Sequence, residues 1–251
     1  MISKALRTLQ CHVPAIRPLK FASYNLGTRV LGWPMEEDFR LLARMAPVGL
    51  ALDIGGNWGQ SIYALQRTAR PAKIVSFEPN PVLSARLTRV FAADTSVEIK
   101  PVGLADQEGA FRLYIPAYRG FIFDGLASLN YDAAAEWLNP HRIYGFDRKR
   151  LTVSEHEVGV KTLDEFGFRP DVVKIDVQGL ELAVIRGGKE TLAASKPVVI
   201  VETPPPDVVA ALGEFGLMPY RYHGDRLIAG DTSGLNTVFI HPEREAALGI
   251  G

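Results

Sequence analysis

The stretch VGLALDIGGNWGQS, residues 48–61, decides the fold. It begins as an apolar run typical of a buried strand, and it continues with an acid, three glycines within five residues and a polar segment suited to a helix. Gly55, Gly56 and Gly59 tolerate positive φ and have no Cβ, so main-chain amides and the start of the next helix can approach a ligand closely. A tight turn without a ligand is the alternative interpretation of such a cluster.

Short β-rich runs alternate with helical patterns along the rest of the chain. The runs are almost entirely apolar, and they occupy residues 48–54, 72–78, 96–102, 171–177 and 197–202. This order predicts parallel strands joined by helical crossovers, with helices covering both faces of the sheet. Residues 217–230 and 235–242 predict an antiparallel hairpin at one edge. We therefore expect a doubly wound, Rossmann-like α/β fold whose sheet is mostly parallel.

Two segments fall outside this pattern. Residues 1–46 lack strand signals, and residues 35–45 carry apolar side chains at helical spacing, so we expect a helical N-terminal lead-in packed on the core. Residues 47–251 are expected to form a single Rossmann-like domain. Within it, residues 116–150 hold seven aromatic side chains among glycines, prolines and charges. This stretch is too long for a plain connection, which predicts an insertion near the site.

Composition and charge narrow the class of protein. The chain has 251 residues, 47% of them hydrophobic, which fits a globular domain. Lys plus Arg (28) equals Asp plus Glu (28), so the chain has no net charge that attracts nucleic acid or an anionic membrane. A local basic patch is still compatible with a net charge of zero. Cys11 is the sole cysteine, which excludes an intrachain disulfide. With no secretory signal and no apolar run of about 18 residues, we expect a cytoplasmic protein without a membrane span.

A second acid favours an adenosine-containing ligand. The segment SFEPNP places Glu78 at the carboxyl tip of the second run, 25 residues after Asp53. A carboxylate at this position can accept both hydroxyl groups of a ribose. A surface glutamate before a proline turn is the alternative.

The residues around the glycines select among adenosine ligands. Asn57 stands where the dinucleotide fingerprint requires its second glycine, and no Gly-Lys-Ser/Thr follows as in a P-loop. The carboxylate of Asp53 would repel phosphate, but it suits the ammonium and sulfonium groups of S-adenosylmethionine. We therefore expect this methyl donor; an NAD(P)-dependent oxidoreductase and a non-catalytic protein that binds S-adenosylmethionine are the alternatives.

With these residues in place, the sequence resembles the FkbM family of S-adenosylmethionine-dependent methyltransferases, within the class I Rossmann-like methyltransferases. The resemblance covers about residues 48–241 and rests on the ordered blocks LDIGGNWGQS, SFEPNP, GLADQEG, KTLDEF, VVKIDVQGLELAVIRGG and PVVIVE. Two positions depart from the family pattern. Gly56 replaces the typical alanine, and Gln178 replaces a frequent glutamate, which questions any role of that carboxylate.

The resemblance implies a seven-stranded sheet with an antiparallel final strand, and O-methylation of a sugar or polyketide hydroxyl group. The partner would be a small molecule or glycan, and a homodimer is one alternative for the oligomeric state. The residues implied to bind the donor are Asp53, Gly55, Gly56, Asn57 and Gly59 at the methionine part, Glu78 and Pro79 at the ribose, Leu104 and Asp106 near the adenine, and Asp176. Asp106 is equally suited to capping the turn before Gly109.

A hydroxyl acceptor needs a base that removes its proton. Asp176 ends the fourth run on the crevice side and is the first candidate, with a helix N-cap as the alternative role. Glu202 ends the fifth run, where it could hold a substrate hydroxyl or join Asp176 around Mg²⁺. His141 and His156 are alternative bases. Ser128 lies in GLASLN, where the family carries a serine-leucine loop close to the acceptor, and is a candidate acceptor contact.

Overall fold

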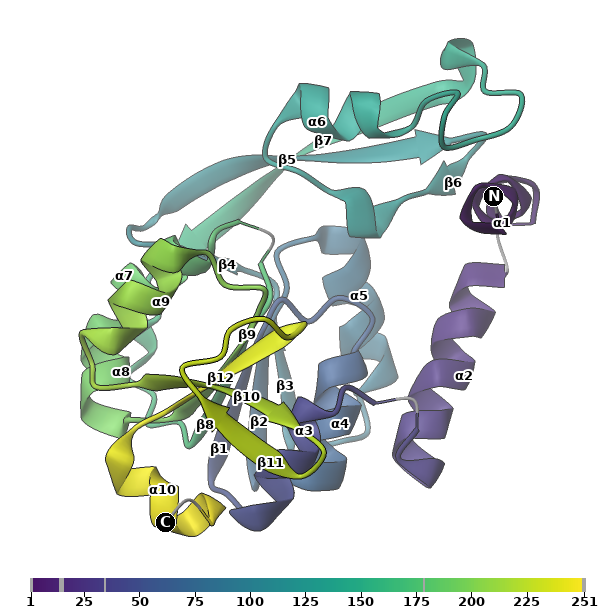
Figure 1. Cartoon of the computed structure of the whole chain (residues 1–251). Coiled ribbons are helices and arrows are strands. Elements are labelled where there is room, and N and C mark those ends of the chain that lie inside the picture. The colour runs from purple at the N-terminus through teal and green to yellow at the C-terminus, as the bar shows by residue number, and fades with distance from the viewer. Residues whose placement is uncertain (1, 14–15, 34, 178, 250–251) are drawn as a thin grey trace.

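The computed structural model describes residues 2–13, 16–33, 35–177 and 179–249. They form two β-sheets and the helices around them (Figure 1). The first sheet has eight strands in the order β11-β10-β12-β9-β8-β1-β2-β3. Its strands are β1 (Leu50–Ile54), β2 (Lys73–Phe77), β3 (Val97–Lys100), β8 (Val172–Ile175), β9 (Val198–Glu202), β10 (Met218–His223), β11 (Arg226–Ala229) and β12 (Asn236–Ile240).

Helices cover both faces of this sheet, which confirms the predicted doubly wound α/β class. One layer contains α3 (Asp38–Leu41), the 3₁₀ helix η1 (Leu42–Arg44), α4 (Gln60–Thr68), α5 (Pro81–Val90) and α10 (Pro242–Leu248). The other contains α7 (Glu181–Gly187), α8 (Lys189–Ser195), α9 (Pro206–Gly213) and the 3₁₀ helix η4 (Asp164–Phe166).

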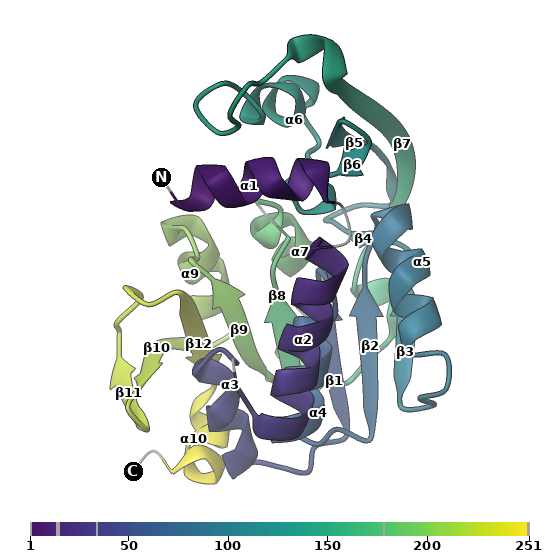
Figure 2. The same ribbon diagram turned by 90° about the vertical axis from the view of Figure 1, so that its right-hand side faces the viewer.

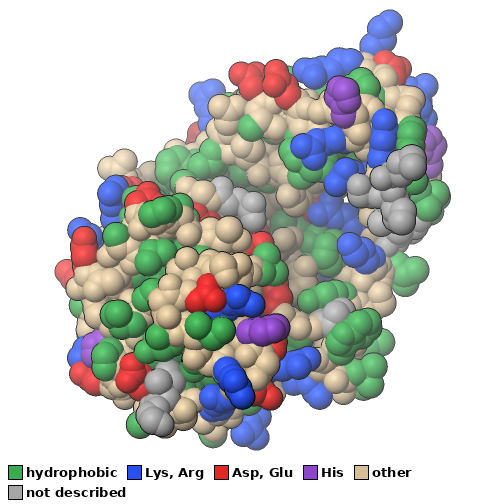
Figure 3. Space-filling model, viewed as in Figure 1, with side chains coloured by type: hydrophobic (Ala, Val, Ile, Leu, Met, Phe, Trp, Pro, Cys, Tyr) green, Lys and Arg blue, Asp and Glu red, His purple; other side chains and the backbone are tan. Residues whose placement is uncertain are grey.

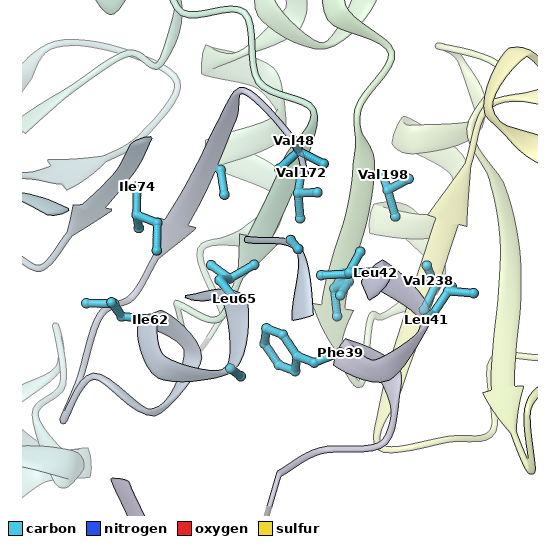
Figure 4. Packing of buried hydrophobic residues seen from close by; sticks show 14 of the residues in the cluster. Phe39, Leu41, Leu42, Val48, Ile62, Leu65, Ile74, Val172, Val198 and Val238 are labelled. Atoms are coloured by element: carbon cyan, nitrogen blue, oxygen red, sulfur yellow. The ribbon is translucent and has the colours of Figure 1, made fainter. Parts of the chain in front are cut away.

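Successive strand residues face opposite layers. Ala51 and Val172 contribute to the first core, and Leu52 and Val173 contribute to the second. Figure 4 shows the first core, in which Phe39 and other helix residues lie beside strand residues such as Val172. Because both faces are covered, the central parallel strands consist mostly of apolar residues.

The antiparallel edge differs from the prediction in one respect. The expected hairpin forms, since β10 pairs with β11 from Tyr220↔Ala229 to His223↔Arg226. However, β12 lies inside the sheet, because it pairs antiparallel with both β9 and β10. All five of its residues are buried, as expected for an interior strand. With β11 added at the edge, the sheet has eight strands where the family resemblance implied seven.

The second sheet begins after β3 in the chain. It has the order β4-β7-β5-β6 and contains β4 (Gly103–Leu104), β5 (Gly109–Tyr118), β6 (Phe121–Ile122) and β7 (Leu151–Lys161). Between β6 and β7 lie the 3₁₀ helices η2 (Asp124–Leu126) and η3 (Arg148–Arg150) and the helix α6 (Tyr131–Trp137). The sheet therefore extends beyond both ends of the predicted insertion at residues 116–150, and the division into domains stays a prediction.

The N-terminal helices α1 (Ile2–His12) and α2 (Ile16–Leu31) connect the two sheets (Figure 2). α2 packs along α4 of the first sheet. α1 contacts the second sheet instead, where Cys11 is buried beside Tyr118 and Phe121. Among the described residues, no helix combines the length and the apolar character that crossing a bilayer requires.

Candidate functional site

The carboxyl ends of four neighbouring strands lie side by side at one end of the first sheet. β1 pairs with β2 and β8, and β8 pairs with β9, all in parallel. The residues that follow or end these strands are therefore neighbours: Gly55 after β1, Glu78 after β2, Asp176 after β8 and Glu202 at the end of β9. Doubly wound folds bind their ligands at the carboxyl ends of the strands.

A cavity of about 200 Å³ lies at this end of the sheet, between the strand ends and α2. Its lining combines polar side chains with aromatic ones and contains Lys20, Phe21, Tyr24, Thr28, Met35, Glu36, Phe39, Gly55, Asn57, Gln60, Ser61, Ala64, Lys174 and Asp176. The structure thus brings three predicted site residues, Gly55, Asn57 and Asp176, into one cavity. The volume is below the roughly 300–1,000 Å³ of typical ligand pockets, so the cavity has room for only part of a ligand of usual size.

The glycine turn is packed against the protein itself. The amides of Gly55 and Gly56 donate to the carbonyl oxygen of Phe77 at 2.9 and 3.1 Å. Gly55 has a φ of +96°, and a Cβ there would lie 1.9 Å from the carbonyl oxygen of Asp176. The first glycine is therefore required by the close approach of the β8–α7 loop. Sequence reasoning expected these amides to be free for a ligand.

Asp53 lies behind the turn and is fully buried. Its Oδ2 accepts a hydrogen bond of 2.8 Å from the hydroxyl of Ser76, and burial raises the pKa of its carboxyl group. As placed, the side chain supports the strand end and does not reach the cavity lining. The predicted contact between Asp53 and the donor stays a prediction.

Glu78 bridges the glycine turn and the next helix. Its Oε2 accepts from the amide of Asn57 at 2.7 Å, and its Oε1 accepts from the amide of Asn80 at 2.9 Å. Asn80 in turn caps α5. Only 6% of Glu78 is exposed, and burial raises the pKa of its carboxyl group to about 7 despite these hydrogen bonds. The carboxylate is thus oriented at the end of β2, as predicted, but nearly closed off from solvent.

Asp176 and Glu202 form a pair of acids at adjacent strand ends. Burial raises the pKa of Glu202, and the charge of Asp176 and a hydrogen bond with it add to this effect. The alternative role of Asp176 as a helix N-cap is wrong, because α7 begins at Glu181 and its N-cap residue is Leu180. The pair can share one proton, which is suitable for acid–base chemistry.

These two acids lack the donor set of a metal site. Within the part of the chain that the structure describes, no group of three or more His, Cys, Asp or Glu side chains is arranged to hold a metal ion. Mg²⁺ usually needs carboxylates with near-ideal octahedral geometry, completed by water or substrate oxygens. The magnesium alternative for Asp176 and Glu202 therefore has no structural support.

Lys174 is a site residue that the sequence analysis missed. It is 4% exposed, lines the cavity, and its Nζ donates to Oδ1 of Asn236 at 3.1 Å. Nδ2 of Asn236 donates to Glu36 at 2.9 Å and to Asp38 at 3.1 Å. A lysine within the otherwise apolar run DVVKIDV is the signal that could have identified it, because buried lysines need polar partners.

A cluster from α2 covers the glycine turn and was also missed. Phe21 stacks on Trp58 with ring centroids 4.6 Å apart. Arg17 forms an ion pair with the buried Asp124 of η2, and the guanidinium of Arg86 lies 4.1 Å from the Trp58 ring centre. These contacts join residues far apart in sequence, and no local pattern predicts them.

The remaining predicted residues lie outside the cavity lining. His156 is on β7, with Nε2 3.1 Å from the Ser154 hydroxyl. His141 lies on the exposed loop after α6. Ser128 pairs with Tyr114 through main-chain hydrogen bonds. The other residues predicted to bind the donor are the buried Leu104, the exposed Asp106, the half-buried Pro79 and the turn residues Gly56 and Gly59. Gln178, which departs from the family pattern, lies outside the described residues.

Comparison with known proteins assigns the family. The family described as methyltransferase FkbM domain matches residues 49–224. The 2-O-methyltransferase NoeI of Sinorhizobium fredii (strain NBRC 101917 / NGR234) is 26% identical in an alignment of 162 residues that covers 62% of this chain and 63% of NoeI. The chain thus spans a little under two thirds of the length of this curated relative.

Two solved structures are similar to the chain at low identity. The methyltransferase FkbM from Methylobacillus flagellatus KT has a TM-score of 0.48 and 12% identity, over 77% of this chain and 44% of that chain. Aeropyrum pernix fibrillarin, in complex with natively bound S-adenosyl-L-methionine, has a TM-score of 0.41 and 11% identity, over 82% and 74%. Both scores are low, so the fold assignment rests on the strand order.

The strand order and the cavity at the strand ends define a doubly wound, Rossmann-like α/β fold. The chain belongs to the methyltransferase FkbM domain family, whose match covers most of its length. The predicted family is thereby confirmed.

Proposed function

We propose that the protein is an S-adenosylmethionine-dependent O-methyltransferase that acts on a hydroxyl group of a small molecule or glycan. The observation that carries the proposal is the paired carboxyl groups of Asp176 and Glu202, beside the cavity that the glycine turn lines. Family membership supplies the methyl-transfer chemistry. The name of NoeI, a 2-O-methyltransferase, supports a hydroxyl acceptor.

Residues of the glycine turn fit the methyl donor. The Oδ1 atom of Asn57 is buried without a hydrogen-bond partner among the described residues, and Asn57 lines the cavity. An ammonium group of the donor could donate to it. Each oxygen of the Glu78 carboxylate accepts one amide hydrogen bond and retains a lone pair for a ribose hydroxyl. Because Glu78 is nearly closed off, donor binding requires a movement of the side chains that cover it.

When bound, the donor supplies an electrophilic methyl group. Asp176 removes the proton from the acceptor hydroxyl, and Glu202, whose pKa is raised by burial and by the charge of Asp176, lies beside this base. Burial raises the pKa values of Asp53 and Glu202, and the positive charge of Lys174 opposes part of this rise. We place the enzyme in the cytoplasm, because a single cysteine, free and buried, suits a reducing compartment.

Calorimetry with S-adenosylhomocysteine tests donor binding. The folded protein should bind at micromolar level or better, and Glu78→Ala should abolish binding. Isotopically labelled donor, incubated with a panel of saccharides and with cell extract, tests transfer. Asp176→Asn should lower transfer by about 10²-fold or more, whereas Asp132→Asn on α6, away from the cavity lining, should leave both transfer and S-adenosylhomocysteine affinity unchanged. Folded protein without any binding would refute the proposal.

A further inference from the structure

The helix α2 is amphipathic, but its apolar face is turned toward solvent and its polar face toward the protein. Its inner face is polar or aromatic: Asn25 is buried and donates to the carbonyl oxygen of Trp58 at 2.9 Å, and Tyr24 lines the cavity. Its outer face carries Leu19, Leu26 and Val30, which are between 61% and 70% exposed. A surface helix normally turns its apolar stripe toward the core.

The outer residues form one continuous stripe. Spacings of seven and four residues place Leu19, Leu26 and Val30 on the same side of a helix. Trp33, just beyond the helix end, is 68% exposed and continues this apolar surface along the chain. Of the sixteen exposed large hydrophobic side chains in the described ranges, seven lie between residues 9 and 33. The apolar surface is therefore concentrated on the N-terminal helices.

The charge of this segment has a single sign. Residues 2–33 contain five of the 28 Lys and Arg residues and none of the 28 Asp and Glu residues, although the whole chain is neutral. Lys20, which also lines the cavity, follows Leu19, and Arg29 precedes Val30. At about 100° per residue, the two exposed cations therefore lie on opposite sides of the stripe. Figure 3 shows Lys and Arg side chains next to hydrophobic ones on this side of the molecule.

We propose that the outer face of α2 docks on an anionic lipid bilayer, with the helix lying in the plane of the interface. An apolar stripe flanked by lysine and arginine has the geometry of interfacial helices, because the long side chains reach the headgroups while the apolar face enters the acyl boundary. Each cation near an anionic surface contributes about 1 kcal/mol. A second copy of the chain is the less suitable occupant, since a symmetric contact would bring the same cations together.

Sedimentation with lipid vesicles tests the docking. The full chain should bind vesicles of equal amounts of phosphatidylglycerol and phosphatidylcholine, bind pure phosphatidylcholine vesicles much less, and lose affinity as salt is added. The double variant Leu26→Glu/Val30→Glu should weaken binding by about tenfold or more. Ile228→Glu, at a 43% exposed position on β11, is the matched control and should leave binding unchanged.

Tryptophan fluorescence gives a second readout. Anionic vesicles should shift the emission of the wild-type chain to shorter wavelength. Trp33→Phe should remove this shift, because Trp58 is already buried and Trp137 packs against the cluster around Tyr118 and Phe121. Circular dichroism and S-adenosylhomocysteine binding confirm that the variants are folded. Absent binding, equal binding to both vesicle types, or binding that survives Leu26→Glu/Val30→Glu would overturn the proposal. A dimer in light scattering that Leu26→Glu dissociates would assign the stripe to a second copy and also overturn it.

Discussion

The substitution Glu78→Gln removes a buried carboxyl group whose protonation depends on pH. Burial raises the pKa of Glu78 from the ordinary 4.5 to about 7. A group with a raised native pKa contributes stability that is fully present below its unfolded pKa and is lost as pH rises through its native pKa. At about 1.4 kcal/mol per pH unit, the full difference is about 3 kcal/mol.

The glutamine variant does not titrate at this position. The difference in unfolding free energy, variant minus wild type, should therefore rise by about 2.5 kcal/mol between about pH 5 and about pH 8.5. Any constant cost of placing an amide beside the Asn57 and Asn80 amides cancels in this comparison. Urea denaturation of both proteins at the two pH values, followed by circular dichroism, measures the change.

Glu98→Gln is the control. Hydrogen bonding to Lys100 lowers the pKa of Glu98, so its titration lies below 4.5 and its variant should show a flat difference across the same window. A difference for Glu78→Gln that also stays constant, within about 0.5 kcal/mol, would refute the reasoning. The carboxyl group of Glu78 would then be hydrated, and its burial at the end of β2 would be wrong.

Three further substitutions test the packing of the site, each by urea denaturation. Gly55→Ala should cost more than about 3 kcal/mol, because its Cβ would lie 1.9 Å from a main-chain carbonyl oxygen, whereas Gly120→Ala, with a φ of +80° and no atom within 4 Å, should cost about 1–2 kcal/mol. Arg17→Met should cost about 3 kcal/mol by leaving Asp124 buried without its cation, and adding Asp124→Asn should recover part of the loss; strictly additive costs would contradict the ion pair. Lys174→Met should lower stability more at about pH 8 than at about pH 5, because the nearby carboxyl groups would titrate still higher; an equal loss at both pH values would contradict this coupling.

The first sheet could be predicted from sequence because its strands are buried on both faces. Apolar content alone predicts a strand in short runs such as VVIVE. The position of β12 between β9 and β10 could not be predicted, because strand order depends on pairing between distant segments. The strand β7 was missed because LTVSEHEVGV, which carries a partly alternating pattern, has charged and exposed residues in place of a continuous apolar run.

The site was predictable where the topology of the sheet fixes it. Gly55, Asn57 and Asp176 follow strands whose carboxyl ends must meet, and the structure places all three at one cavity. The burial of Asp53 was not predictable, because it depends on how tightly the turn packs against Ser76 and the loop after β8. The contribution of α2 depends on tertiary contacts such as Phe21 on Trp58, which carry no local signal.

The long ladder between β5 and β7 pairs ten residues on each strand, from Gly109↔Val160 to Tyr118↔Leu151. The chain leaves this ladder at Tyr118 and re-enters it directly opposite, at Leu151. Evolution can therefore lengthen, shorten or exchange residues 119–150 without shifting a single pairing in the parallel sheet. Such changes would leave the strand ends that line the cavity as they are.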